Sequence, residues 1–265
     1  TYQVHAINLL TSLEGMTRLK HLKSLEINPN FRSNSEPEFL PNLKIQALTW
    51  QLDGDYLHEK RIKLICNSLV LPNSLQRHEL VFIKCIQYIS YLLYRVQSLV
   101  NLKSFGLDLL RVNGENTLDI ELLMTTLNKL KHIQSFSFKL RELDPSALQV
   151  IGTKLRENKE LSILCLCFSC AQVSKIQFSQ FIQDLSLLSG LKEFSLKFDR
   201  VKNLKSQDLQ IVPSALQKLT NLTVLSISLT EYKNLTDEFI FALVKTLSGF
   251  QNLTRLELDC SEHTE

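Results

Sequence analysis

A repeated pattern of apolar residues is the feature that most constrains this chain. Six segments read apolar, two variable, apolar, one variable, apolar, and they begin at Leu102, Ile133, Leu161, Leu191, Leu222 and Leu253. Their starts lie 31, 28, 30, 31 and 31 residues apart. Such a period is typical of repeat proteins, in which each unit buries its apolar side against its neighbours. The pattern therefore predicts a stack of similar units.

Earlier copies of the pattern are less regular. One begins at Leu22, and another begins near Leu43 with a register uncertain by about two residues. Because about two periods separate Leu43 from Leu102, we expect a degenerate copy between them and place it at CNSLVLPNS, from Cys66. We expect one repeat domain over residues 1–265 with about eight to nine repeats, irregular over 46–100 and regular over 101–260.

Each unit is predicted to be a strand followed by a helix. Apolar residues lie three and six places before the repeat starts, as Leu185 and Leu188 do before Leu191, and this spacing is helical. Helix starts carry the expected capping residues, because Thr236, Ser206 and Asp144 stand where free backbone N–H groups need acceptors.

With this pattern, L-x-x-L-x-L-x-x-N/C, the chain resembles the leucine-rich repeat family. The period of 28 to 31 residues with a full helix is most similar to the ribonuclease-inhibitor-like subclass. The resemblance covers nearly the whole chain, although the N/C position holds Asn30 in one copy, Leu110 or Arg141 in others, and small polar residues elsewhere. The family hosts many unrelated functions, so the resemblance implies a fold and not a partner.

The expected fold is α/β, a leucine-rich-repeat solenoid. Strands of a parallel sheet lie about 4.8 Å apart, whereas helices need about 8–10 Å, so the strands should take the inner side of a curve. The result would be a horseshoe with parallel strands on the concave face and helices on the convex face.

Alternation along each strand predicts which side chains point away from the core. The candidate concave-face contacts are Ser104, Asp108, Ser135, Ser137, Lys139, Cys165, Cys167, Glu193, Ser195, Lys197, Ser226, Ser228, Arg255, Glu257 and Asp259. These columns hold one Arg and no aromatic residue, whereas tight interfaces usually depend on Trp, Tyr and Arg. Two alternatives stay open: a segment lying closely over the small residues, or contacts made by loops, edges and outer helices.

We expect no catalytic, metal or cofactor site. The chain lacks a Gly-rich phosphate loop, a G-x-S-x-G segment and H-E-x-x-H, and its six His residues are dispersed. Cys165 and Cys167, two apart on a strand, are too distant for a disulfide, so we expect free thiols. Tyr88, Tyr91 and Tyr94 either form a contact surface or pack under the irregular repeat.

Charge predicts no particular partner. Thirty basic and twenty-seven acidic side chains are interspersed along the chain, which gives no concentrated field for nucleic acid or a membrane surface. The most apolar stretch, residues 81–93, is interrupted by polar side chains and falls short of the roughly 20 residues that a membrane span needs. Free thiols favour a cytoplasmic, reducing location.

The leading hypothesis is a non-enzymatic protein-interaction module, a scaffold or recognition arm. One alternative is a regulatory subunit of an enzyme, similar to a ribonuclease inhibitor or a GTPase activator. Another is the recognition domain of a larger signalling protein such as a kinase, since the chain starts at Thr1 without Met and is expected to be a fragment. The last strand, Leu253–Cys260, has no following helix, so we expect self-association through that edge.

Overall fold

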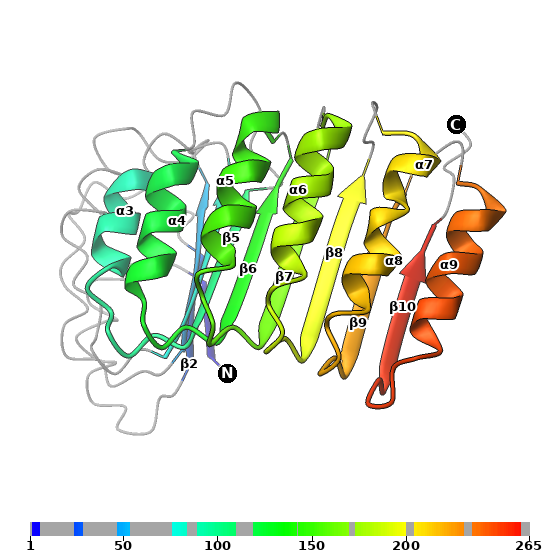
Figure 1. The fold of residues 1–265 in the computed structure, drawn as a ribbon. Helices are drawn as coiled ribbons and strands as arrows, with labels where there is room; N and C mark the ends of the chain where they lie inside the picture. Colours follow the sequence, from blue (N-terminus) through cyan, green and yellow to red (C-terminus); the bar gives the residue numbers. More distant parts are fainter. Residues whose placement is uncertain are drawn as a thin grey trace. The chain divides into compact units, whose positions relative to one another are not determined.

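The computed structural model describes residues 2–5, 24–28, 47–53, 76–83, 89–109, 119–141, 143–169, 173–199, 204–230 and 235–260. Before residue 89, nearly all of this description concerns the backbone alone. The chain divides into two compact units, Thr1–Ile133 and Gln134–Glu265. Figure 1 shows strands and helices in both, an α/β arrangement, and in the second unit each strand up to β9 is followed by one or two helices. Among the described residues, no helix is long and apolar enough to cross a membrane.

In the part of the first unit that the structure describes, there are five strands and two helices. The strands are β1 (Tyr2–His5), β2 (Ser24–Asn28), β3 (Ala47–Asp53), β4 (Arg77–Ile83) and β5 (Ser104–Leu109), and the helices are α3 (Ile89–Val96) and α4 (Ile120–Lys129). Consecutive strands pair in parallel from β1 to β5. The helices α3 and α4 are joined by a hydrogen bond from Gln97 to the buried Thr126, 2.9 Å long.

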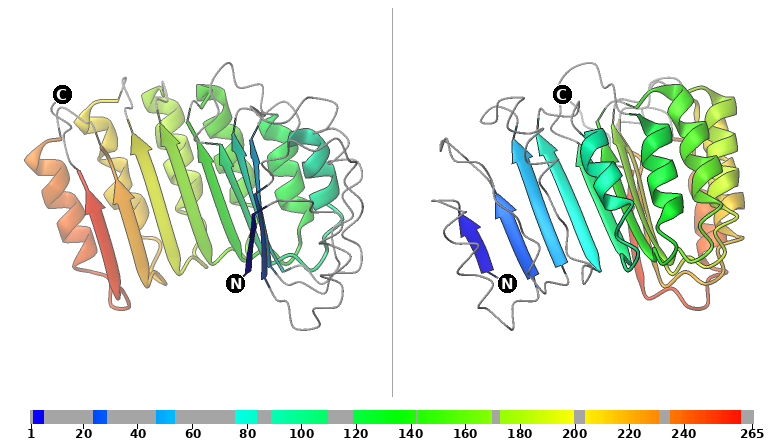
Figure 2. Two further views of the ribbon diagram at one scale, coloured as in Figure 1. Left: turned by 180° about the vertical axis from the view of Figure 1, so that it is seen from behind. Right: turned by 90° about the vertical axis from the view of Figure 1, so that its left-hand side faces the viewer.

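Among the described residues, the second unit has five strands, and each of the first four is followed by one or two helices. Its strands are β6 (Ser135–Leu140), β7 (Ile163–Ser169), β8 (Glu193–Asp199), β9 (Val224–Ser228) and β10 (Arg255–Asp259). Its helices are α5 (Pro145–Leu155), α6 (Lys175–Leu185), α7 (Ser206–Leu209), α8 (Ile211–Leu216) and α9 (Asp237–Leu247). Consecutive strands are parallel. The two views of Figure 2 show the unit's helices on one face of its sheet.

The core of the second unit lies between this sheet and its helices. The burial pattern of β6 alternates strictly, with Phe136, Phe138 and Leu140 buried. The register aligns these residues with the buried residues of the next strands, so Phe138 is followed by Leu166, Leu196 and Ile227. An aromatic cluster lies between the sheet and the helices: the ring centroids of Phe168 and Phe198 are 5.4 Å apart with tilted planes, and Phe181 of α6 packs edge-on against both. Each of the six regular segments of the pattern therefore contains a strand, and the strands of the second unit pair in parallel with their neighbours.

Successive repeats are joined where each strand begins. The carbonyl of Gln134 accepts hydrogen bonds from the N–H groups of both Ser162 and Ile163, at 2.8 and 3.0 Å. The same two-donor arrangement recurs at the carbonyls of Ser162, Lys192 and Thr223. In three of these contacts the first donor residue also donates its side-chain hydroxyl to the same carbonyl; these residues are Ser162, Thr223 and Thr254. These contacts fix how far one repeat is shifted along the strand direction relative to the next.

Of the three expected capping residues, one makes a capping hydrogen bond. Asp144 is the N-cap of α5 and accepts a 2.8 Å bond from the N–H of Ser146. The hydrogen bond from the Ser146 hydroxyl, and then this N–H, hold the pKa of Asp144 below its ordinary value. Thr236 stands at the N-cap position of α9, but its side chain makes no capping hydrogen bond. Ser206 is not a cap, because it lies inside the first turn of α7. Its hydroxyl instead bonds the Thr236 side chain and accepts from the Thr236 N–H, so it joins one repeat to the next.

A proline explains why β8 is followed by two short helices in place of one. Pro213 lies in α8, where a continuous helix would need its N–H to bond the carbonyl of Leu209. Proline has no N–H, and its ring collides with the carbonyl four residues back. The helix is therefore interrupted at Gln210, between α7 and α8.

The expected position of the degenerate repeat, from Cys66, was wrong. The strand between β3 and β5 is β4, Arg77–Ile83, which pairs with both, and Cys66–Ser74 lies outside the described residues. Each regular strand begins two residues after its repeat start, so the start belonging to β4 is Leu75. His78 occupies the next apolar position, which hides the pattern. By the same rule β3 belongs to Ile45, two residues from the expected Leu43, and β1 is a further strand that we did not predict.

The register predicts unequal effects at adjacent positions of β8. Leu196 is buried between Leu166 and Ile227, whereas Ser195 is on the opposite face of the strand. Leu196→Ala should lower the free energy of unfolding by roughly 2–5 kcal/mol, because it leaves a cavity in the core. Ser195→Ala should change it by less than about 0.5 kcal/mol. Urea unfolding of both variants measures the difference, and equal shifts of the midpoint would contradict the register.

Candidate functional site

The sheet of the second unit presents one face that none of the unit's helices covers. We call this surface the strand face and define it by the outward side chains of β6–β10. The register arranges them in three rows across the strands. The rows are Ser135, Ile163, Glu193, Val224 and Arg255; Ser137, Cys165, Ser195, Ser226 and Glu257; and Lys139, Cys167, Lys197, Ser228 and Asp259. The predicted outward residues of five separate repeats therefore lie next to one another on the sheet.

The middle row forms a shelf of small side chains. Ser137, Cys165, Ser195 and Ser226 are neighbours on consecutive strands, and each is half-buried. With strands about 4.8 Å apart, four such positions extend over about 14 Å. Small side chains allow another backbone to approach the sheet closely, and the hydroxyl groups can both donate and accept hydrogen bonds. The shelf therefore suits contact with a polypeptide better than enclosure of a small molecule.

Charged residues lie on either side of this shelf. Glu193 and Arg255 stand in the first row, and Lys197 and Asp259 stand in the third. At the β10 end, Arg255 forms an ion pair with Glu257. The hydrogen bond and positive charge of Arg255 hold the pKa of Glu257 below its ordinary value. Ser228 is nearly buried and its hydroxyl lies 3.5 Å from the Asp259 carboxylate.

The remaining two candidates belong to the first unit. Ser104 and Asp108 are half-buried on β5, with Gly106 buried between them. In the parallel register they neighbour Arg77 and Val81 of β4. They therefore belong to the corresponding outward rows of their own unit.

The cysteines of β7 are free thiols. Cys165 is half-buried and Cys167 is 8% exposed, and neither forms a disulfide. Cys170 lies outside the described residues. Within the described ranges, no three His, Cys, Asp or Glu side chains gather in a way that could hold a metal ion.

The tyrosines singled out in the sequence are described only in part. Tyr94 of α3 is 62% exposed, while Ile89, Leu92 and Val96 of the same helix are buried. Tyr94 therefore does not pack under the irregular repeat. Tyr88 and the side chain of Tyr91 lie outside the described residues, so a surface of several tyrosines stays a prediction.

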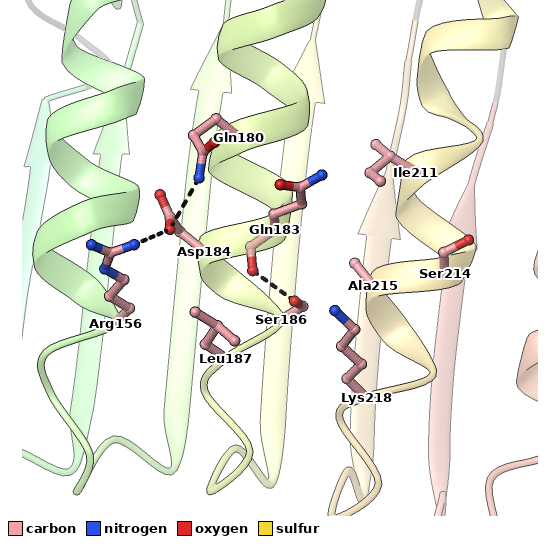
Figure 3. Close-up of a pocket in the computed structure, with 10 residues that line it drawn as sticks. All are labelled: Arg156, Gln180, Gln183, Asp184, Ser186, Leu187, Ile211, Ser214, Ala215 and Lys218. Atoms are coloured by element: carbon pink, nitrogen blue, oxygen red, sulfur yellow. Dashed lines mark hydrogen bonds and ion pairs between the residues drawn. The ribbon is translucent and has the colours of Figure 1, made fainter.

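A groove on the helix side contains a buried charge that we missed in the sequence. It has a volume of about 310 Å³ and extends from Arg156, after α5, across α6 to Lys218, after α8 (Figure 3). Asp184 of α6 is almost fully buried there, and its Oδ1 accepts a 2.9 Å hydrogen bond from the Arg156 guanidinium. This pair connects the helices of two consecutive repeats. The ten lining residues include no histidine or cysteine, and the arrangement offers no nucleophile paired with a base.

The other carboxylate oxygen of Asp184 lies against a glycine. A Cβ atom added to Gly152 of α5 would stand 3.1 Å from Asp184 Oδ2 and 3.3 Å from the Phe181 Cα. Glycine at this position allows α5 and α6 to approach closely enough for the Arg156–Asp184 pair. Asp184 was missed because an acidic residue on a helix ordinarily indicates a solvated position.

Substitution of Gly152 tests the close packing of α5 against α6. Alanine in place of glycine usually stabilises a helix interior by about 0.5–1 kcal/mol, yet Gly152→Ala should destabilise by about 1–3 kcal/mol because the methyl group is forced against Asp184 and Phe181. Gln149→Ala, on the exposed side of α5, is the matched control and should change stability little. Thermal unfolding of both variants provides the measurement, and a more stable Gly152→Ala variant would refute the close packing of α5 and α6.

Comparison with known proteins gives structural similarities only. No family model matches the chain, and no curated protein matches it. Among solved structures, the tropomodulin C-terminal domain of Caenorhabditis elegans aligns with a TM-score of 0.44 and 17% identity, over 59% of this chain and 89% of that chain. TLR13, solved in complex with ssRNA13, aligns with a TM-score of 0.33 and 14% identity, over 96% of this chain and 48% of that one. At such values the description of the fold rests on the strand register and not on these similarities.

Proposed function

We propose that this chain is a non-enzymatic protein-interaction module that binds a polypeptide on its strand face. The observation that carries the proposal is the in-register shelf of Ser137, Cys165, Ser195 and Ser226 on a sheet face free of the unit's own helices. Charged side chains at both margins of the shelf supply orientation and specificity, while the small residues allow close approach. Rigid parallel strands hold these groups in place before binding, which reduces the entropic cost of association.

The architecture supports assignment to the leucine-rich repeats, in the ribonuclease-inhibitor-like subclass with its horseshoe curvature. The support comes from repeats of 28 to 31 residues, each regular repeat of the second unit carrying one parallel strand, with helices of 11 residues in α5, α6 and α9. A single repeat domain over residues 1–265 follows from the same reasoning. These statements are part of the proposal.

Charge does not favour inhibition of a basic ribonuclease. The strand face of the second unit holds Glu193, Glu257 and Asp259 against Lys139, Lys197 and Arg255. Three acidic and three basic groups give no net attraction for a strongly basic partner. We therefore propose a partner of mixed charge. The free thiols of Cys165 and Cys167 support a cytoplasmic, reducing location.

Blocking the shelf tests this function. Ser195→Arg would place a long charged side chain at the centre of the middle row, and its outward direction leaves the core intact. Gln149→Arg adds the same side chain to the exposed surface of α5. Affinity purification with quantitative mass spectrometry should recover the same partner with wild type and Gln149→Arg, and at least tenfold less of it with Ser195→Arg. Equal recovery with all three chains would exclude the strand face as the binding surface.

A further inference from the structure

Neighbouring helices of the second unit are joined by a side-chain hydrogen bond at one recurring position. The residue five places before a repeat start donates to the residue seven places before the next repeat start. Arg156 donates in this way to Asp184 between α5 and α6, at 2.9 Å. Gln217 donates to Thr246 between α8 and α9, at 3.4 Å. The bond therefore connects the helices of consecutive repeats on both sides of the α6–α8 pair.

Between α6 and α8 the same two positions cannot form this bond. They hold Ser186 and Ala215. Ala215 has no polar side-chain atom, and the Ser186 hydroxyl donates instead to the Gln183 carbonyl of α6, at 2.6 Å. Both side chains are small and buried, and both line the helix-side groove of about 310 Å³. The groove therefore lies at the position where the bond between helices is missing.

Apolar side chains are accessible on both walls of this groove. Leu187, which follows α6, is 49% exposed, and Ile211 at the start of α8 is half-buried. Figure 3 shows Leu187 on the α6 side and Ile211 on the α8 side. An apolar side chain that entered between the two walls would remove this surface from water, which favours binding.

The charge that water can reach in the groove is positive. Three of the ten lining residues are charged. The Asp184 side chain is only 2% exposed and is bonded by Arg156, whose own side chain is 44% exposed. A guanidinium has five N–H donors, so Arg156 can bond a further acceptor. Lys218 is exposed at the other side of the groove. These charges favour an occupant that carries an acidic group.

Spacing along α8 favours a helical occupant over an extended one. Ile211 and Lys218 are seven residues apart, which is two helical turns and about 10 Å along the axis. A second helix lying alongside α8 has the same spacing between its own residues i and i+7, and both point to the same side. In an extended segment, residues about 10 Å apart are three positions apart, so their side chains point to opposite faces.

We propose that this groove binds an α-helix of a partner protein. The helix packs an apolar stripe against Leu187 and Ile211, and it places an acidic residue opposite Lys218, seven positions from the first apolar residue. Docking of an amphipathic helix into an apolar groove is a recurring mode of peptide recognition. The groove is on the opposite side of the sheet from the strand face, so this contact is additional to the function proposed above and does not depend on it.

Designed peptides test the contact directly. The probe is a fluorescently labelled, Ala-rich helical peptide with Leu at positions i and i+4 and Glu at i+7. A second peptide has Lys in place of Glu, and each is also made in reversed order because a helix can lie in either direction. Fluorescence anisotropy with the 265-residue chain should show that the better Glu peptide binds at least about fivefold more tightly than its Lys counterpart, since a like-charge contact replaces an ion pair.

Charge reversal on the chain assigns the site. Lys218→Glu changes an exposed residue, so the core stays intact, and it should reverse the preference in favour of the Lys peptide. Lys245→Glu, the same change at an exposed position of α9, is the matched control and should leave the preference unchanged. Ser195→Arg, which blocks the strand face, should also leave peptide binding unchanged and so separates this site from the proposed function.

A photoreactive group next to the first Leu of the peptide locates the bound helix. Its crosslinks, identified by mass spectrometry, should lie on α6 and α8 around Leu187 and Ser214. Absence of saturable binding by all four peptides would overturn the proposal. A preference that Lys218→Glu does not change, or crosslinks confined to the strand face, would also overturn it.

Discussion

The second unit depends on one backbone arrangement, a carbonyl before each strand that accepts two consecutive N–H groups from the next repeat. Gln134, Ser162, Lys192 and Thr223 all provide such a carbonyl. This arrangement sets the shift between neighbouring strands, and a shift by one residue would exchange the core and outward faces of a strand. The aromatic core around Phe168 and Phe198 and the shelf around Ser195 are therefore two results of the same register.

The repeat pattern was sufficient to predict the strand centres and the outward residues of the second unit. Leu196 and Ser195 could be assigned to opposite faces because a strand has a side-chain period of two and the pattern fixes its phase. The rows of the strand face followed because every regular repeat has the same phase. Asp144 could be identified as a cap because its role depends only on residues next to it in the sequence.

Features that depend on contacts between repeats could not be predicted in this way. Ser206 resembles a cap locally, but its hydroxyl bonds Thr236 thirty residues later. Asp184 is buried only because Gly152 and Arg156 of the previous helix surround it. The repeat from Leu75 was missed because His78 replaces an apolar residue and the pattern has no independent marker. For Ser206 and Asp184 the deciding partners lie about one period away.

A crosslinking experiment tests the register of the strand face most directly. Cys165 is a natural thiol in the middle row, and Ser195→Cys would place another on the adjacent strand, about 4.8 Å away. A short reagent with two thiol-alkylating groups should bridge these two residues through two thioether bonds, as identified by mass spectrometry of the linked peptides. Ser226→Cys, two strands from Cys165, should give little bridging. Preferential bridging of Cys165 to position 226, or none to position 195, would contradict the arrangement on which the strand face depends.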